Sequence, residues 1–259
     1  ITFRALSILK KSNIILCEDT RRSAKLLSFF QMKNKLLSYH KFNEKKISSK
    51  IIDLIKNDKI VSLISDAGTP TISDPGLILV NKCIEEDLKV YPIPGPSAVT
   101  SAVSISGFSD RYLFYGFLPK KEKELERILK NLSNINYSIV FFVSAEKINF
   151  YTSKFKSYFF DRKILIAREM TKIHEEFIRD NVSKIKNLSE NLKGELTVVL
   201  SQKVMEKNIK KEINESVRME IKKMLKKYTH KDVVEFIAKK ENLSKKIIYD
   251  YCLKLKKQK

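Results

Sequence analysis

Proline and glycine are concentrated in one stretch of this chain, and that stretch constrains the fold more than any other feature. All six prolines and five of the six glycines lie between residues 60 and 119. Most of them fall in two short segments, 65–76 and 91–98. Proline fixes φ and glycine adopts backbone angles that other residues avoid, so we expect two rigid loops here.

Each of these loops follows an apolar run that is typical of a strand, 59–64 and 88–90, and each leads into a helical pattern. Asp74 and Pro75 resemble a cap followed by proline at the first helical position, which predicts a helix start near Asp74. Ligands bind beyond the carboxyl ends of parallel strands in open α/β sheets. We therefore interpret the two loops as opposite walls of a small-molecule site; the alternative is a pair of stiff connections without a ligand.

The two loops lack the sequence motifs of two common nucleotide-binding folds. Neither segment contains the GxGxxG pattern of dinucleotide-binding folds or the GxxxxGK[ST] pattern of phosphate-binding loops. The three cysteines are widely spaced in apolar runs, which predicts buried thiols in a reducing compartment and gives no metal-binding spacing. No run of apolar residues is long enough to span a bilayer and no signal-peptide pattern opens the chain, so we expect a cytoplasmic protein.

The formal net charge of +21 points to a polyanionic partner, with RNA or DNA as the first expectation. However, 42 of the 51 basic residues are lysines spread along the chain, and a lysine-biased composition alone could produce this charge. The few arginines are more informative, because arginine suits bidentate contacts to phosphate. Those adjoining the candidate site segments are Arg21, Arg22, Arg111 and Arg168, although each could equally form a structural ion pair.

Alternating strand and helix patterns predict two α/β domains with mostly parallel sheets, followed by a helical tail. Residues 1–111 form the expected N-terminal domain, which begins on a helix and so lacks a first strand. Residues 112–202 form the second domain. Residues 203–259 contain no glycine or proline, carry a net charge of 18 − 8 = +10 and show three helical patterns. This tail is interpreted either as an RNA-binding element or as a packing or dimerisation element.

Several motifs occur together in an order that resembles a known family. They are Glu18-Asp19-Thr20-Arg21, Ser65-Asp66-Ala67-Gly68-Thr69-Pro70, Ser73-Asp74-Pro75-Gly76, Pro94-Gly95-Pro96-Ser97-Ala98, Thr171-Lys172-Ile173-His174-Glu175-Glu176 and Gly194-Glu195. Together they resemble the tetrapyrrole-methylase superfamily of class III methyltransferases, within it the bacterial branch that acts on 16S ribosomal RNA. The Thr-Pro-Ile-Gly-Asn-Leu loop that usually opens such chains is absent, and Val143-Ser144-Ala145-Glu146-Lys147 replaces the usual segment of that region.

The resemblance implies S-adenosylmethionine bound in a cleft between the two α/β domains of a homodimer. It implies a substrate as well, the 2′-hydroxyl of a cytidine ribose in the decoding region of 16S ribosomal RNA. The implied cofactor-binding residues are Asp66, Ala67, Gly68, Thr69, Ser97, Ala98, Val143 and Met170.

Methyl transfer to a hydroxyl needs aligned reactants and an acceptor for the hydroxyl proton, and it needs no metal. The candidate bases at strand ends are Glu18, Asp19 and Asp66, among which the sequence does not choose. Candidate RNA contacts are Arg21, Arg22, His40 and Arg111; Arg21 could instead neutralise the adjacent acids, and His40 could be structural. Two other functions stay open, methylation of a tetrapyrrole or another small acidic substrate, and RNA binding without catalysis.

Overall fold

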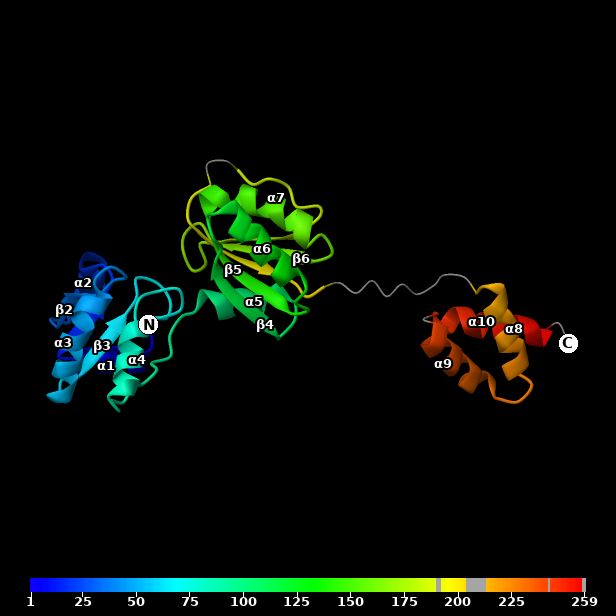
Figure 1. Cartoon of the computed structure of the whole chain (residues 1–259), viewed down its shortest axis with the longest axis horizontal. Helices are drawn as coiled ribbons and strands as arrows, with labels where there is room; N and C mark the ends of the chain where they lie inside the picture. Colours follow the sequence, from blue (N-terminus) through cyan, green and yellow to red (C-terminus); the bar gives the residue numbers. More distant parts are fainter. Residues whose placement is uncertain (190–191, 204–212, 242, 258–259) are drawn as a thin grey trace. The chain divides into compact units, whose positions relative to one another are not determined.

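The computed structural model describes residues 1–189, 192–203, 213–241 and 243–257, with side chains through residue 255. The chain divides into two compact units, Ile1–Val204 and Met205–Lys259. The first unit contains two β-sheets with their helices, and the second is helical (Figure 1). No helix in the described part of the chain has both the length and the apolar character needed to cross a membrane.

The first sheet consists of three parallel strands in the order β2-β1-β3. Their bounds are Ile14–Cys17 for β1, Lys35–Ser38 for β2 and Val61–Ile64 for β3. Four helices accompany them, α1 (Phe3–Lys11), α2 (Thr20–Phe29), α3 (Glu44–Lys56) and α4 (Leu77–Glu85). All four residues of β1 are buried, because alternate side chains enter cores on the two faces of the sheet. The parallel α/β arrangement predicted for this region is confirmed.

Two local predictions in this part of the chain are wrong. Residues 88–90 form no strand, and the proline-rich segment that follows has few N–H groups to donate to a sheet. Helix α4 begins at Leu77 instead of near Asp74. Ser73 has a positive φ of 68°, which breaks the helical path, and Gly76 at φ +135° becomes the cap residue. A β-carbon on Gly76 would lie 2.6 Å from the Leu63 side chain, so glycine is required there.

The second sheet has five strands in the order β4-β5-β8-β6-β7. Their bounds are Tyr112–Phe117 (β4), Ser138–Ser144 (β5), Lys163–Arg168 (β6), Glu176–Asn181 (β7) and Glu195–Leu200 (β8). Only β4 and β5 pair in parallel; β8 runs antiparallel to both of its neighbours, and β7 is antiparallel to β6. The expectation of a mostly parallel sheet is therefore wrong for this region, where β7 was not anticipated. As a result, the carboxyl ends of β4, β5 and β6 share one edge with the amino end of β8.

Helices cover both faces of this second sheet. On one face α6 (Glu122–Ser133) and α7 (Ile148–Tyr158) enclose the larger core, and a short 3-10 turn (Ala145–Lys147) precedes α7. On the other face lies α5 (Ala98–Ser106), which packs on β8 and β6 although it precedes the sheet in sequence (Figure 1). The segment 91–97 thus carries the chain from the first sheet to the second.

The second unit contains three helices among its described residues, as the tail pattern predicted. They are α8 (Glu215–Met224), α9 (His230–Glu241) and α10 (Lys245–Lys257). The unit has a hydrophobic core of its own, in which Ile221, Ile237 and Ile248 are fully buried. Thr229 caps α9 by accepting a hydrogen bond from the Asp232 backbone N–H.

Candidate functional site

The two rigid loops are in direct contact. Thr69 Oγ1 donates a hydrogen bond of 3.1 Å to the carbonyl oxygen of Pro96. Gly68 has a φ of +76°, and a β-carbon there would lie 3.9 Å from the same carbonyl. The loop after β3 and the segment before α5 therefore face each other, as the sequence predicted.

The loop after β3 is fixed at both ends by polar contacts. At its start, Ser65 Oγ donates to the carbonyl oxygens of Ala67 and Gly68, at 3.2 and 3.1 Å. At its end, the backbone N–H of Gly76 donates to Glu44 Oε2 on α3, at 3.3 Å. These hydrogen bonds hold the backbone of the loop at both ends.

The amino end of α5 points toward the edge of the second sheet where β6 ends. Ser97 caps the helix by accepting a hydrogen bond from the Thr100 N–H. At the other end of α5, the Ser109 N–H donates to Gln202, which follows β8 beside the start of β6. The helix therefore runs opposite to β6, and its unpaired first N–H groups face the carboxyl edge of the strands.

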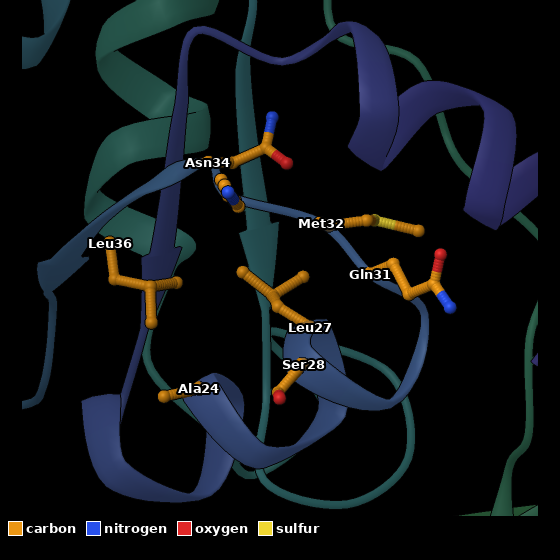
Figure 2. A pocket seen from close by; sticks show the side chains of 8 residues that line it. Ala24, Leu27, Ser28, Gln31, Met32, Asn34 and Leu36 are labelled. Carbon is orange, nitrogen blue, oxygen red and sulfur yellow. The ribbon is translucent and has the colours of Figure 1, made fainter.

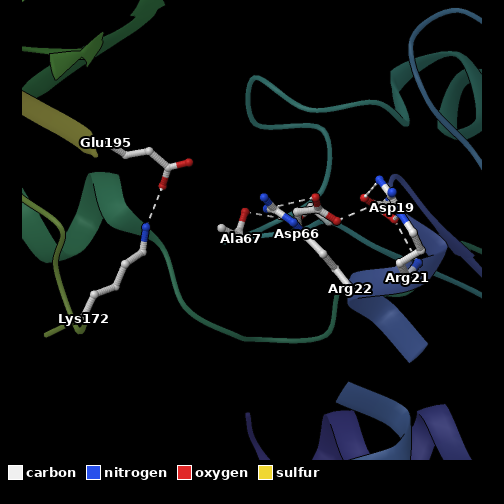
Figure 3. Close-up of polar contacts among 8 residues, drawn as sticks. Asp19, Arg21, Arg22, Asp66, Ala67, Lys172 and Glu195 are labelled. Carbon is white, nitrogen blue, oxygen red and sulfur yellow. Dashed lines mark hydrogen bonds and ion pairs between the residues drawn. The ribbon is translucent and has the colours of Figure 1, made fainter. Parts of the chain in front are cut away.

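A group of carboxylates lies where β1 and β3 end side by side (Figure 3). Asp19 caps α2 through the Arg21 N–H at 2.8 Å, and the Arg21 guanidinium grips both of its oxygens at 3.1 and 2.8 Å. These hydrogen bonds with Arg21 lower the pKa of Asp19 to about 2. Asp66 forms an ion pair with Arg22 at 3.2 Å and accepts from the Asp19 N–H at 3.4 Å.

Two further acids complete this group. Glu18 is exposed and forms no hydrogen bond or ion pair with any described residue. Asp74 is half-buried, and its pKa is raised, chiefly by burial and next by the negative charge of Glu18. Sequence reasoning missed Asp74 because it assigned this residue to a helix start; only the folded loop turns its carboxyl toward Glu18 and Asp66.

From the second sheet, Met170 and Val143 contribute in different ways. Met170 follows β6 and packs against the smaller core, to which Val99 of α5 belongs. Val143 is only 2% exposed and its side chain enters the larger core under α6 and α7. Side chains alternate between the two faces of a strand, and that of Val143 points away from α5. A ligand on the α5 face could therefore contact only the backbone of Val143.

Two of the predicted RNA contacts lie elsewhere. His40 sits in the turn before α3, where Nδ1 accepts from the Phe42 N–H at 3.3 Å, which fits the structural alternative. Arg111 precedes β4 at its amino end, so the structure does not bring it to the edge where the loops meet.

A pocket of about 360 Å³ lies apart from these loops, between α2 and β2 (Figure 2). Its lining is formed by Ala24, Leu27, Ser28, Gln31, Met32, Lys33, Asn34 and Leu36. None of the predicted site residues contributes to it.

Residues 1–186 match the family model described as Tetrapyrrole (Corrin/Porphyrin) Methylases. The chain belongs to this family. The resemblance inferred from the motifs is therefore confirmed, and the match covers the first sheet and the second sheet through β7, whereas β8 lies beyond it.

The chain is also similar to curated proteins from several bacteria. It is 47% identical to "Ribosomal RNA small subunit methyltransferase I" of Thermotoga maritima over 206 residues, 78% of this chain and 92% of the relative. The protein of the same name in Bacillus subtilis is 32% identical over 257 residues, covering 96% of this chain and 88% of its own length. Both relatives are methyltransferases by name, in line with the predicted enzyme class.

Among solved structures, the fold is similar to that of the methyltransferase CobJ. The TM-score is 0.57 at 13% sequence identity, covering 78% of this chain and 88% of CobJ. At that identity the likeness concerns the fold alone, and it confirms the predicted pair of α/β regions.

Proposed function

We propose that this protein transfers a methyl group from S-adenosylmethionine to the 2′-hydroxyl of a cytidine ribose in 16S ribosomal RNA. The observation that carries the proposal is the contact between Thr69 and Pro96, which joins two preformed loops beside the amino end of α5. The ribosomal RNA substrate follows from the names of the bacterial relatives, and the nucleotide position from the motif resemblance.

The residues around the joined loops fit the chemistry of this methyl donor, which supplies a methyl group activated on a positively charged sulfur. Glu18, Asp66 and Asp74 place negative charge near such a cation. The free N–H groups at the start of α5 suit the carboxylate of the donor. Met170 and Val99 offer apolar surface beside them. The loop backbone from Ala67 to Thr69 and the backbone of Ser97 and Ala98 complete the proposed contacts.

The proton of the ribose hydroxyl needs an acceptor, and the ion pairs and hydrogen bonds of the nearby carboxylates show which of them is free to accept it. Asp19 is held by Arg21 and by the helix cap, and a carboxyl with a pKa of about 2 is a weak base. Asp66 is paired with Arg22. Asp74 has a raised pKa, which makes its carboxylate the stronger proton acceptor, so we assign it this role with Glu18 as the alternative.

Ribosomal RNA also fits the basic character of the chain. Alongside the net charge of +21, the C-terminal unit exposes Tyr228, Phe236 and Tyr249, at 56%, 51% and 49% of their surface. Lysines with exposed aromatic rings are the combination that holds single-stranded RNA, through phosphates and stacked bases. Arg21 and Arg22, at the start of α2, would contact phosphate near the reacting ribose.

A second candidate substrate is a tetrapyrrole, which the description of the matched family favours. The assay that separates the two supplies the purified protein with labelled S-adenosylmethionine and offers 30S subunits, free 16S ribosomal RNA or a corrinoid precursor in parallel. We expect label in RNA, at a 2′-hydroxyl of cytidine. Label in the corrinoid alone would support the second substrate.

Binding of RNA without binding of the donor in calorimetry would identify a non-catalytic RNA-binding protein. We also propose, from the family resemblance, that the protein works as a homodimer. Light scattering of the eluted protein tests this directly, and a monomer mass at assay concentration would contradict it.

A further inference from the structure

The turn between β6 and β7 has an unusual backbone on both sides of Met170. Glu169 has a φ of +45° and Thr171 a φ of +67°, a region that side-chain-bearing residues seldom occupy. Such angles persist only where surrounding contacts hold them. The contacts that do so here come from one carboxylate and one glycine.

The carboxylate belongs to Glu169. Its Oε1 accepts a hydrogen bond from the Glu195 backbone N–H at 2.9 Å and another from Lys172 Nζ at 2.9 Å. The backbone closes the same connection, because the Glu169 N–H donates to the Glu195 carbonyl oxygen at 3.1 Å. Lys172 also pairs with the Glu195 carboxylate at 3.2 Å (Figure 3). The start of the turn is thereby fastened to the start of β8.

The glycine is Gly194, which precedes β8. A β-carbon at this position would lie 2.5 to 2.6 Å from three atoms of the Glu169 side chain, and its φ of +107° also excludes other residues. Gly194 therefore forms the space into which the Glu169 side chain fits. The Glu169 side chain cannot retreat without breaking its hydrogen bond to the Glu195 N–H.

Separate hydrogen bonds hold the part of the turn that follows Met170. The Thr171 N–H donates to Glu175 Oε1 at 2.7 Å, and the Lys172 N–H donates to the Glu169 carbonyl oxygen at 2.9 Å. Met170 is thus held between two fixed residues, and its side chain packs against the smaller core that includes Val99 of α5.

We propose that Glu169, seated against Gly194, is a positioning residue that fixes the Met170 turn in the form that receives the methyl donor. This inference rests on the proposed function. Glu169 touches neither the donor nor the RNA; it acts through the backbone of residues 170 and 171. Its loss should therefore weaken donor binding while leaving the affinity for RNA unchanged.

The test compares Glu169→Gln and Gly194→Ala with the control Glu126→Gln. Glu126 lies on α6, which covers the same sheet, and it forms an ion pair with Lys154 at 3.1 Å, away from the turn. The control therefore removes the same charge without touching the turn. Each protein is titrated with S-adenosylmethionine by calorimetry, and the KM values for donor and for 30S subunits are measured separately, with kcat.

We expect the first two variants to raise the donor Kd and KM about tenfold or more, the size that follows from losing a charge-assisted hydrogen bond. The KM for subunits should stay unchanged, as should all values for the control. A merely structural role would instead lower kcat with the folded fraction and leave the donor KM alone, which would overturn the proposal.

The pH dependence supplies a second readout that needs no Gly194 variant. The Glu195 N–H and then Lys172 lower the pKa of Glu169, so its carboxylate stays charged until the solution is clearly acid. Protonation of Glu169 should weaken donor binding in that acid range, and Glu169→Gln should lack this contribution, whereas the weakening caused by protonation of Glu18, Asp66 and Asp74 should appear in both proteins. If the unaltered protein binds no donor, the proposed function itself fails; if it binds and the variants match it at every pH, only the positioning role fails.

Discussion

At the scale of single residues, the acids around the loop after β3 divide into those that are already paired and those that are not. Asp19 and Asp66 form ion pairs with Arg21 and Arg22, so each has a structural partner. Asp74 forms no ion pair with a described residue, and its pKa is raised by burial and by the charge of Glu18. A carboxylate held in this way is a better proton acceptor at neutral pH than one in an ion pair.

Replacing Asp74 with asparagine should separate activity from stability. We expect kcat to fall by about 100-fold or more, because the amide cannot accept the proton. The raised pKa means that the charged form is disfavoured in the folded state, so the uncharged variant should have a Tm at neutral pH no lower than that of the parent. Steady-state kinetics and thermal unfolding measure the two effects, with Asp53→Asn on the exposed side of α3 as the control.

The pH dependence of kcat/KM also tests the assignment of Asp74 as the general base. A base must be unprotonated, so kcat/KM should rise with pH through the raised pKa of Asp74. Asp74→Asn should lose this rising limb, whereas the control should keep it. An unchanged profile in Asp74→Asn would transfer the role to Glu18.

Arg162 is the clearest structural residue of the second sheet. It is 1% exposed, and its guanidinium donates to carbonyl oxygens at the ends of several elements. The acceptors are Ser133, Ile135, Tyr137 and Ser201.

Arg162→Met should therefore leave several buried carbonyls unpaired and lower the free energy of unfolding by about 3 kcal/mol or more. Urea denaturation measures the loss. Arg179→Met, which removes an exposed arginine with one bond to the Ile105 carbonyl, should cost less than about 1 kcal/mol. Equal losses in the two variants would contradict this account of Arg162.

At the scale of elements, the predictable parts of the fold are those set by local pattern. The apolar run predicts a strand over 13–17 and the amphipathic spacing a helix over 120–132, each within two residues of the observed bounds of β1 and α6. The antiparallel strand β7 could not be predicted, because its polar sequence becomes a strand only by pairing with β6. The absence of a strand at 88–90 likewise depends on which partners the sheet supplies.

The same distinction applies to the candidate site. The two loops were predictable, because proline and glycine mark special backbone wherever they occur. Asp74 and the pair of Glu169 with Gly194 were not, since their roles arise from contacts between residues distant in sequence. Gly194 is the one glycine outside residues 60–119, and its isolation is the sequence signal that could have pointed to its contact with Glu169.

The contact between the two loops can be tested through one hydroxyl. Thr69→Val keeps the shape of the side chain and removes its hydrogen bond to Pro96, which is worth about 0.5–1.5 kcal/mol. We expect the donor KM to rise by about two- to tenfold, and Thr69→Ser to restore it. A donor KM unchanged in Thr69→Val would show that the loops need not touch for binding.

In the whole molecule, the C-terminal unit has its own core and a strongly basic surface, and we propose that it contributes RNA affinity independently of the proposed methyl-donor site. Lys246 and Lys254 are exposed on α10, on the same helix as the exposed ring of Tyr249.

The double substitution Lys246→Ala with Lys254→Ala should weaken binding to 16S ribosomal RNA and make it less salt-dependent. Each lost phosphate contact reduces the slope of log affinity against log salt by about 0.7 to 0.9. Donor affinity should not change. Filter binding over a salt series measures the slope, and Lys56→Ala on α3 is the control; an unaltered slope would assign RNA binding to the first unit alone.

We propose that the two loops, the start of α5 and the turn after β6 hold one methyl donor together. Backbone hydrogen exchange can be measured for the protein with and without S-adenosylmethionine. We expect the donor to slow exchange of amides in three segments, 66–69, 97–99 and 169–171, and to leave exchange around the pocket between α2 and β2 unchanged. Protection confined to that pocket, or donor binding without protection in these segments, would contradict it.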